Sequence, residues 1–285
     1  MKKGLILIQS VIIISLILFS GCTVQDNSEP DNIPDGLYVS SSGEKDFLSI
    51  QTAIDASSEN ETIYVFSGIY KENVIINKTI TLMGENPVTT IIDGNKSGNV
   101  LTVSSAKKCN ISGFTIQNSG LNNAGIDLST PYNNITNNIF QDNYDGIYDR
   151  NGNYNIIKNN KFISHARYGV YLSGSDFNSL VNNQFLNNSY GVRIKARNNE
   201  VMQNTFKNNG RGLYFCCYAE KNLVYHNNFL NNTVWNAKDN YKGQIWHSDD
   251  LSEGNYWDDY TGTDSDGDGI GDTPYNITSD GTKQD

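Results

Sequence analysis

The sequence predicts an all-β protein, a single-stranded, right-handed parallel β-helix with three short strands per coil and about 22 residues per coil. The first observation behind this prediction is an Asn-x-Phe signature that returns after 22, 23, 21 and 23 residues, at Phe140, Phe162, Phe185, Phe206 and Phe229. The second is a pair of further apolar series that keep step with it, each in a short run bounded by Asn or Gly. A leucine-rich repeat shares this period, but it needs helical spacing, which no unit shows.

The two further series give each unit three apolar positions. One follows a glycine and consists of Ile126, Ile147, Val170, Val192 and Leu213. The other lies five residues before each Phe and consists of Ile135, Ile157, Leu180, Val201 and Val224. Because side chains alternate along a strand, we expect these positions to point inwards and to form the core.

Asparagine and glycine are expected at the turns between strands. Asparagine tolerates the left-handed conformation that sharp turns need, and it recurs three residues after the Phe, at Asn143, Asn188, Asn209 and Asn232. The stacked turns should also stack these amides in a column, which His165 interrupts. The glycine before the second series is expected because the backbone needs a positive φ there.

The N-terminus predicts export. Lys2 and Lys3 precede an apolar run over residues 5–19, and Ser20-Gly21-Cys22 then resembles a lipobox, so we predict lipidation of Cys22. We expect a lipoprotein-type signal peptide over residues 1–22, a flexible acidic tether over 23–35, the β-helix over 36–240 and an aromatic, acidic C-terminal cap over 241–285. The protein is therefore expected on the extracellular or periplasmic face, anchored to the cell membrane.

The charge narrows the class of partner. Without Lys2 and Lys3 the chain has 31 acidic and 19 basic residues, a formal net charge of −12. An acidic surface argues against nucleic acid and anionic lipid as partners.

The three remaining thiols are not expected to bridge distant coils. Cys109 lies four to five coils from Cys216 and Cys217, roughly 20 Å at the usual strand spacing. Cys216 and Cys217 could form a strained vicinal bridge, but we expect all three thiols to be buried as small apolar side chains.

A helical pattern precedes the repeats. Phe47, Ile50, Ala53 and Ile54 fall on one helical face over residues 46–57, behind Asp46 as N-cap, and this helix is expected to cover the open end of the core. Less regular strands are expected at residues 62–66, 72–76, 79–83, 89–92 and 100–103.

Several motifs resemble a known family. The opening Phe47-x-x-Ile50-x-x-Ala53-Ile54 and Leu82-x-Gly84-Glu85 resemble the start of pectin-lyase-like right-handed β-helix proteins. Asn227-Asn228-Phe229, Gly254-Asn255-Tyr256-Trp257 and the segment 264–275 resemble the NosD-like branch, which is common among archaeal cell-surface proteins. The resemblance implies the fold strongly and the function weakly, because one scaffold carries unrelated sites.

Copper handling is the activity that the NosD resemblance implies, since the proteins that name the branch are linked to copper insertion into a periplasmic reductase. This chain has three histidines, at different repeat positions, and only Met83 and Met202 after the signal. A cluster of soft ligands is therefore not expected, and copper handling is the less favoured function.

A polysaccharide hydrolase or lyase is the alternative activity. Arg193-Ile194-Lys195 matches one polygalacturonase motif, but the other motifs of that family are missing. Asp127 and Asp145 should lie ~11 Å apart, whereas a glycosidase needs carboxyl groups roughly 5 to 9.5 Å apart. Asp149 would be nearer to Asp127, but alternation points it inwards. We therefore expect no catalysis, with these three aspartates as the candidates if there is any.

Two outward columns are the predicted ligand-binding site. The residue after each inward apolar position should point out, which gives Asp127, Tyr148, Tyr171, Arg193 and Tyr214. The residue before each glycine should emerge beside it, which gives Ala124, Asp145, Tyr168, Tyr190 and Arg211. Ring faces beside planar hydrogen-bonding groups suit the sugars of a polysaccharide or envelope glycan. The alternatives are tyrosines that only stabilise an exposed sheet and a structural envelope element without a ligand.

The C-terminal segment predicts a cation site, with Ca²⁺ as the cofactor. Acidic residues alternate around a glycine turn as in calcium loops of the EF-hand and dockerin kind, with ligands at Asp264, Asp266, Asp268, Ile270 (through its carbonyl) and Asp272. Tyr275 stands where an EF-hand has its bidentate Glu. The alternative is an acidic, solvated turn.

Overall fold

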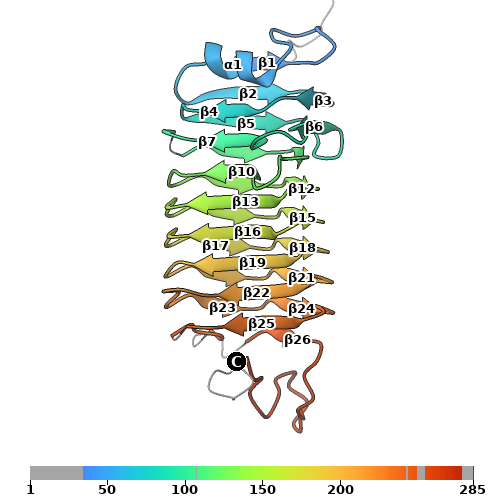
Figure 1. Ribbon diagram of the computed structural model, residues 1–285, viewed down its shortest axis with the longest axis vertical. Helices are drawn as coiled ribbons and strands as arrows, with labels where there is room; N and C mark the ends of the chain where they lie inside the picture. Colours follow the sequence, from blue (N-terminus) through green and yellow to red (C-terminus); the bar gives the residue numbers. More distant parts are fainter. Residues whose placement is uncertain (1–34, 107, 242, 249–253, 278–284) are drawn as a thin grey trace, which may run out of the picture. The chain divides into compact units, whose positions relative to one another are not determined.

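The computed structural model describes residues 35–106, 108–241, 243–248, 254–277 and 285. Within these residues three parallel sheets wind around one axis as a β-helix (Figure 1). Successive coils pair in register, so that Ile135 lies beside Ile157 and Leu180 beside Val201. The predicted fold class is confirmed.

Each sheet takes one strand from each coil. Sheet A consists of β1 (Leu37–Val39), β2 (Glu61–Val65), β5 (Ile80–Gly84), β8 (Asn110–Ser112), β11 (Asn134–Thr136), β14 (Ile156–Lys158), β17 (Ser179–Val181), β20 (Glu200–Met202) and β23 (Leu223–Tyr225). Sheet B consists of β3 (Gly68–Lys71), β6 (Thr90–Asp93), β9 (Thr115–Gln117), β12 (Ile139–Gln141), β15 (Lys161–Ile163), β18 (Gln184–Leu186), β21 (Thr205–Lys207), β24 (Asn228–Leu230) and β26 (Tyr256–Trp257). Sheet C, which faces the reader in Figure 1, consists of β4 (Val74–Ile76), β7 (Leu101–Val103), β10 (Ala124–Leu128), β13 (Asp145–Arg150), β16 (Tyr168–Ser173), β19 (Tyr190–Lys195), β22 (Arg211–Phe215) and β25 (Trp235–Asp239).

The five repeat phenylalanines stack in one interior column, as predicted. Their ring centroids lie 4.7 to 4.9 Å apart with nearly parallel planes, and all five side chains are fully buried. The column continues with Trp257, 4.3 Å from Phe229, and with Tyr275, 4.1 Å from Trp257. The C-terminal aromatic residues thus cover the last coil of the core.

Stacked asparagines line all three corners of the coil. Asn160 shows the pattern at the corner from sheet A to sheet B: its Oδ1 accepts from the backbone N–H of Asn138 at 2.9 Å, and its Nδ2 donates to the carbonyl of Ile135. Equivalent columns run through the other corners, for example from Asn188 to Asn209 and from Asn155 to Asn178. Each buried amide therefore ties one coil to the next.

The role predicted for Asn143 and its equivalents is partly wrong. These asparagines stack, but they are not the left-handed residues. Positive φ belongs to the residue before each stacked asparagine, for example Asp142 at 53°, Asn187 at 57° and Asn208 at 56°. The side chain after a left-handed residue turns into the corner, where its amide reaches the neighbouring coil.

The reason predicted for the strand glycines is also wrong. Gly125, Gly146, Gly169, Gly191 and Gly212 do not have positive φ. Instead, a Cβ on Gly191 would lie 2.7 Å from the carbonyl oxygen of Gly212 and 2.7 Å from a ring carbon of Phe206. Glycine is needed there because the phenylalanine column packs directly against the backbone of sheet C.

The helix begins later than predicted. Helix α1 covers Ile50–Ala56, and its N-cap is Ser49, whose side chain accepts from the N–H of Thr52. Asp46 lies before the helix, where its carboxylate accepts from the N–H of Tyr38. The helix buries Ile50, Ala53 and Ile54 at the first coil, so the predicted capping role is confirmed (Figure 1).

His165 takes the place of one corner asparagine, so the hydrogen-bonded column passes through it instead of breaking. Its Nδ1 accepts from the N–H of Asn143 at 3.3 Å, and its own N–H donates to Asn188. The imidazole is fully buried, its Nε2 has no hydrogen-bond partner, and burial lowers its pKa to about 3. The ring is therefore neutral and carries its proton on the unpartnered nitrogen.

The cysteine prediction is partly wrong. All three described thiols are free, and Cys109 and Cys216 are buried, but Cys217 is exposed in a corner with positive φ. Cys22 lies outside the described residues. Among the described residues, no helix combines the length and apolar character that a membrane span needs.

Loss of one ring from the phenylalanine column should be costly. We expect Phe185→Ala to lower the free energy of unfolding by about 3 to 5 kcal/mol, because it opens a cavity between two coils. The neighbouring Gln184→Ala, which changes an exposed side chain, should cost less than about 0.5 kcal/mol. Urea denaturation measures both, and equal losses would contradict the register.

His165→Asn should stabilise the protein, because asparagine supplies the amide of the other coils and removes the unpartnered N–H. We expect a gain of about 1 to 2 kcal/mol at pH 7. The lowered pKa means that wild-type stability is lost as pH falls from 6.5 towards 3, so the advantage of the variant should grow by about 2 kcal/mol at pH 5. Urea denaturation of both proteins at the two pH values measures this, and parallel pH profiles would contradict it.

Candidate functional site

The predicted outward residues of sheet C lie beside one another in the paired strands, but the prediction that all of them emerge is partly wrong, because Asp127, Asp145 and Tyr168 are buried. Consecutive pairing partners run from Asp127 through Tyr148, Tyr171 and Arg193 to Tyr214. Beside this column Ala124 pairs with Asp145, and a second series pairs Tyr168 with Tyr190 and Arg211. We call these nine polar and aromatic residues, without Ala124, the tyrosine–arginine face.

The five tyrosine rings of this face contact one another. Tyr148 and Tyr171 are stacked at 5.0 Å with almost parallel planes. The ring centroid of Tyr168 lies 5.1 Å from that of Tyr171 and 5.2 Å from that of Tyr190. The centroids of Tyr190 and Tyr214 are 6.3 Å apart. The rings therefore form one aromatic cluster across four coils, in which Tyr168 is buried and the other four tyrosines are partly exposed.

The arginines are held among the rings. The guanidinium of Arg193 lies 5.0 Å from the centroid of Tyr171 and 5.7 Å from that of Tyr214. It also donates to the hydroxyl of Tyr168 at 2.6 Å and to the thiol of Cys216 at 3.3 Å. Arg211 lies 4.7 Å from the ring centroid of Tyr190. These contacts fix the arginine planes against the aromatic surface.

The two aspartates are not free carboxylates. Asp127 forms an ion pair with Arg150, whose Nε is 3.1 Å from Oδ1, and Asp145 forms one with Arg167, whose Nε is 2.9 Å from Oδ1. Asp145 is only 1% exposed. Both carboxylates are thus held in two-pronged pairs with arginine.

Sequence reasoning missed three residues of this surface. Arg150 lies two positions after Tyr148, so alternation alone could have placed it, whereas Arg167 lies in a turn before β16, where alternation carries no information. Trp235 pairs with Arg211, and its ring centroid lies 5.7 Å from that of Tyr214. Its repeat unit has Asn236 in place of the glycine, which hid it from the pattern.

Asp149 faces the interior, as alternation predicts. Its carboxyl accepts from the N–H of Gly152, from Asn155 Nδ2 and from Ser175 Oγ. Burial raises its pKa to about 7, although these hydrogen bonds oppose the shift. Its side chain is fully buried, so the described residues of this face do not offer the pair of accessible carboxyl groups that glycoside hydrolysis needs.

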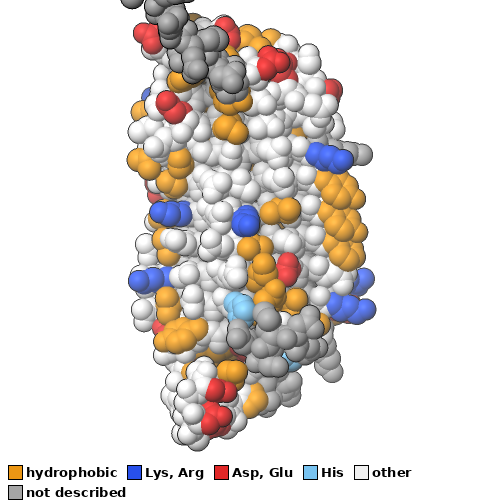
Figure 2. All heavy atoms as spheres, turned by 180° about the vertical axis from the view of Figure 1, so that it is seen from behind, with side chains coloured by type: hydrophobic (Ala, Val, Ile, Leu, Met, Phe, Trp, Pro, Cys, Tyr) orange, Lys and Arg blue, Asp and Glu red, His pale blue; other side chains and the backbone are white. Residues whose placement is uncertain are grey.

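A second aromatic column, which the sequence reasoning also missed, lies at the corner from sheet C to sheet A. Tyr132, Tyr154 and Phe177 stack at 5.2 and 5.0 Å and are 45 to 49% exposed. All three have positive φ. Figure 2 shows a vertical run of hydrophobic side chains along one edge of the back face. Because these rings stack face to face, they present mainly their edges to solvent.

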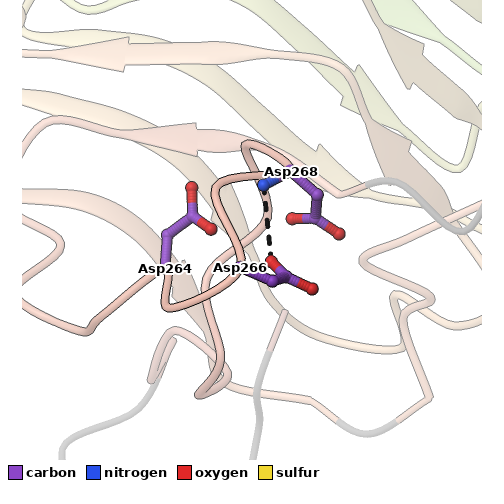
Figure 3. A group of neighbouring side chains, drawn as sticks. All are labelled: Asp264, Asp266 and Asp268. Carbon is purple, nitrogen blue, oxygen red and sulfur yellow. Dashed lines mark hydrogen bonds between the residues drawn. The ribbon is translucent and has the colours of Figure 1, made fainter.

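The Asp-rich segment brings together three of the four aspartates that were predicted as ligands. Carboxylate oxygens of Asp264, Asp266 and Asp268 lie within 4.8 Å of one another on the surface (Figure 3). Backbone N–H groups order the loop, for example from Gly267 and Gly269 to the Asp264 carboxylate. Asp272 does not join the group. Its Oδ2 accepts from Ser265 and Thr263, and these hydrogen bonds lower its pKa.

A cavity of about 870 Å³ lies beside this loop. Asp264 and Asp268 line it together with Tyr256, Trp257, Ile270 and Tyr275. It lies at the C-terminal end of the stack, apart from the strands that carry the tyrosine–arginine face.

The comparisons with known proteins agree with this architecture. Residues 54–262 match the family model described as "Periplasmic copper-binding protein (NosD)". The chain belongs to the NosD family. Another member, the "Probable ABC transporter binding protein NosD" of Pseudomonas aeruginosa, is 34% identical over 77 residues. That match covers 27% of this chain and 18% of the relative, so the chain spans less than a fifth of the curated relative's length.

Solved structures show the same fold in carbohydrate-active enzymes. A pectin methylesterase from Aspergillus niger aligns with this NosD-family protein with a TM-score of 0.52 and 13% identity, over 76% of this chain and 93% of that enzyme. An alginate lyase from Paenibacillus sp. aligns with a TM-score of 0.50 and 13% identity, over 72% of this chain and 91% of that enzyme. At this identity the likeness shows the fold alone.

The donors that the structure describes do not fit copper. Among these residues the only group of three or more His, Cys, Asp or Glu side chains close enough to share a metal ion is the exposed Asp264, Asp266 and Asp268. These oxygen donors suit hard cations, whereas copper prefers histidine, cysteine and methionine. His165 is enclosed in the corner column. His226 and His247 line the cavity beside the Asp-rich loop, but they do not belong to the group of three aspartates.

Proposed function

We propose that this NosD-family protein binds a polysaccharide or envelope glycan outside the cell membrane, through the tyrosine–arginine face. The observation that carries the proposal is the cluster of four partly exposed tyrosines packed around the buried Tyr168, with arginines fixed among them. The lipoprotein-type N-terminus would anchor the protein to the membrane, and the family description as periplasmic supports a location outside the cytoplasmic membrane.

The chemistry of the face suits a sugar chain. Apolar C–H faces of sugar rings pack on aromatic rings, and sugar hydroxyls bond to planar polar groups such as guanidinium. The rings recur on consecutive coils, about 5 Å apart, so an extended chain lying along the stack would meet an aromatic contact on each coil. The two aspartates are occupied by arginine, which favours binding over cleavage.

A polysaccharide hydrolase or lyase is the second candidate, because the fold is shared with a pectin methylesterase and an alginate lyase. Asp127 and Asp145 would then need to leave Arg150 and Arg167 before either could act as acid or base. Measurement of released products alongside binding separates the two functions.

Removal of two rings should abolish most of the binding. We expect Tyr171→Ala with Tyr190→Ala to weaken glycan binding roughly tenfold to hundredfold, because two stacking contacts are lost. A glycan array followed by calorimetry measures the effect, and Tyr132→Ala with Tyr154→Ala is the matched control at the other aromatic column. Undiminished binding by a folded Tyr171/Tyr190 variant would remove the main support for the proposal.

We further propose that the Asp264, Asp266 and Asp268 loop binds Ca²⁺, with the Ile270 carbonyl as an additional ligand. Calorimetry should give a dissociation constant of ~10⁻⁴ to 10⁻³ M, because the loop lacks the bidentate Glu of an EF-hand. Asp266→Ala should lose the signal, and Asp55→Ala, at an exposed position on α1, should keep it. Absence of heat from the wild type would refute the site.

A further inference from the structure

We infer that the ligand of the tyrosine–arginine face is an anionic polysaccharide, whose carboxylate or sulfate groups pair with Arg193 and Arg211. This inference rests on the proposed function and names the class of glycan. It is carried by the distribution of arginine and by the way its charge is compensated along the face.

Arginine is concentrated on this one surface. The chain has five arginines in 285 residues, and four of them contact the face, namely Arg150, Arg167, Arg193 and Arg211. The chain as a whole is acidic, with 31 acidic and 21 basic residues. The planar guanidinium matches the two oxygens of a carboxylate or sulfate better than an ammonium group does.

The positive charge is compensated at one end of the face only. Arg150 and Arg167 pair with Asp127 and Asp145 on β10 and β13. Arg193 and Arg211, on β19 and β22, form no ion pair with any residue that the structure describes. Lys238 on β25 lies beside Tyr214 in the strand register and adds a further positive charge at this end. The face is therefore neutral towards the N-terminal coils and cationic towards the C-terminal coils.

Arg193 lacks a negatively charged neighbour, which an anionic ligand would supply. It is half-buried, and its neighbours are the Tyr168 hydroxyl, the Cys216 thiol and tyrosine rings. Burial raises the pKa of both Tyr168 and Cys216, so neither carries a compensating negative charge at neutral pH. A partly desolvated charge without a counter-ion is unfavourable, and an anion from outside would relieve it.

Aromatic contacts lie beside the uncompensated charge. Trp235 lies beside Arg211 in the register of β25 and β22, and the Trp235 ring centroid lies 6.0 Å from that of Tyr190. A sugar unit could pack on Trp235 and Tyr190 while its acidic group reaches Arg211. Neutral units of the same chain would contact the exposed ring edges of Tyr148 and Tyr171, which are stacked face to face.

The test compares the charged and uncharged forms of two polysaccharides. Calorimetric titration of the protein with oligogalacturonate and its methyl ester, and with dextran sulfate and dextran, separates carboxylate from sulfate recognition. We expect at least one charged form to bind about tenfold or more tightly than its uncharged counterpart, with affinity that falls as NaCl is raised. Arg193→Gln and Arg211→Gln should each remove most of that preference.

Arg197→Gln is the matched control, because Arg197 pairs with Glu220 away from this face. Arg211→Gln decides the outcome if Arg193→Gln lowers the melting temperature. Equal affinity for charged and uncharged forms, or a preference that survives Arg211→Gln, would refute the inference that the ligand is anionic. The proposed function, glycan binding, would not be affected by either result. Absence of binding to any glycan would overturn both.

Discussion

The stacked corner amides are the interaction on which the rest of this structure depends. At each corner the backbone N–H of a buried asparagine donates to the side-chain oxygen of its equivalent in the next coil, as Asn183 does to Asn204, and the Nδ2 of Asn183 also donates to the carbonyl of Ile157 in the preceding coil. These bonds hold each repeat position directly above its equivalent. The phenylalanine column, the close glycine contacts and the outward tyrosines and arginines all follow, because every repeat position then becomes a column.

The sequence was sufficient for the fold and for the columns because both follow from period and alternation. It was insufficient wherever a residue's role depends on a contact between coils. The glycines of sheet C pack against Phe rings, the left-handed residues precede the stacked asparagines, and Ser49 rather than Asp46 caps the helix. None of these choices changes the periodicity, so the repeat alone could not reveal them.

At the candidate site, too, the sequence predicted the positions of residues but not the contacts between their side chains. Alternation placed nine residues on one face, but the pairing of Asp127 with Arg150 and of Asp145 with Arg167 depends on side-chain reach, which a repeat pattern does not contain. That pairing changes the chemistry of the face, because the carboxylates are occupied and the remaining charge is cationic. In the Asp-rich loop, spacing placed the triad but not Asp272, whose carboxylate bonds to Ser265 and Thr263.

The central claim is that the tyrosine–arginine face binds a glycan, and a crystal structure with a bound oligosaccharide tests it most directly. The account predicts that the saccharide lies along sheet C, with sugar rings on Tyr171 and Tyr190 and with polar or acidic groups against Arg193 and Arg211. A saccharide bound instead at the Tyr132 column, or in the cavity beside the Asp-rich loop, would contradict it.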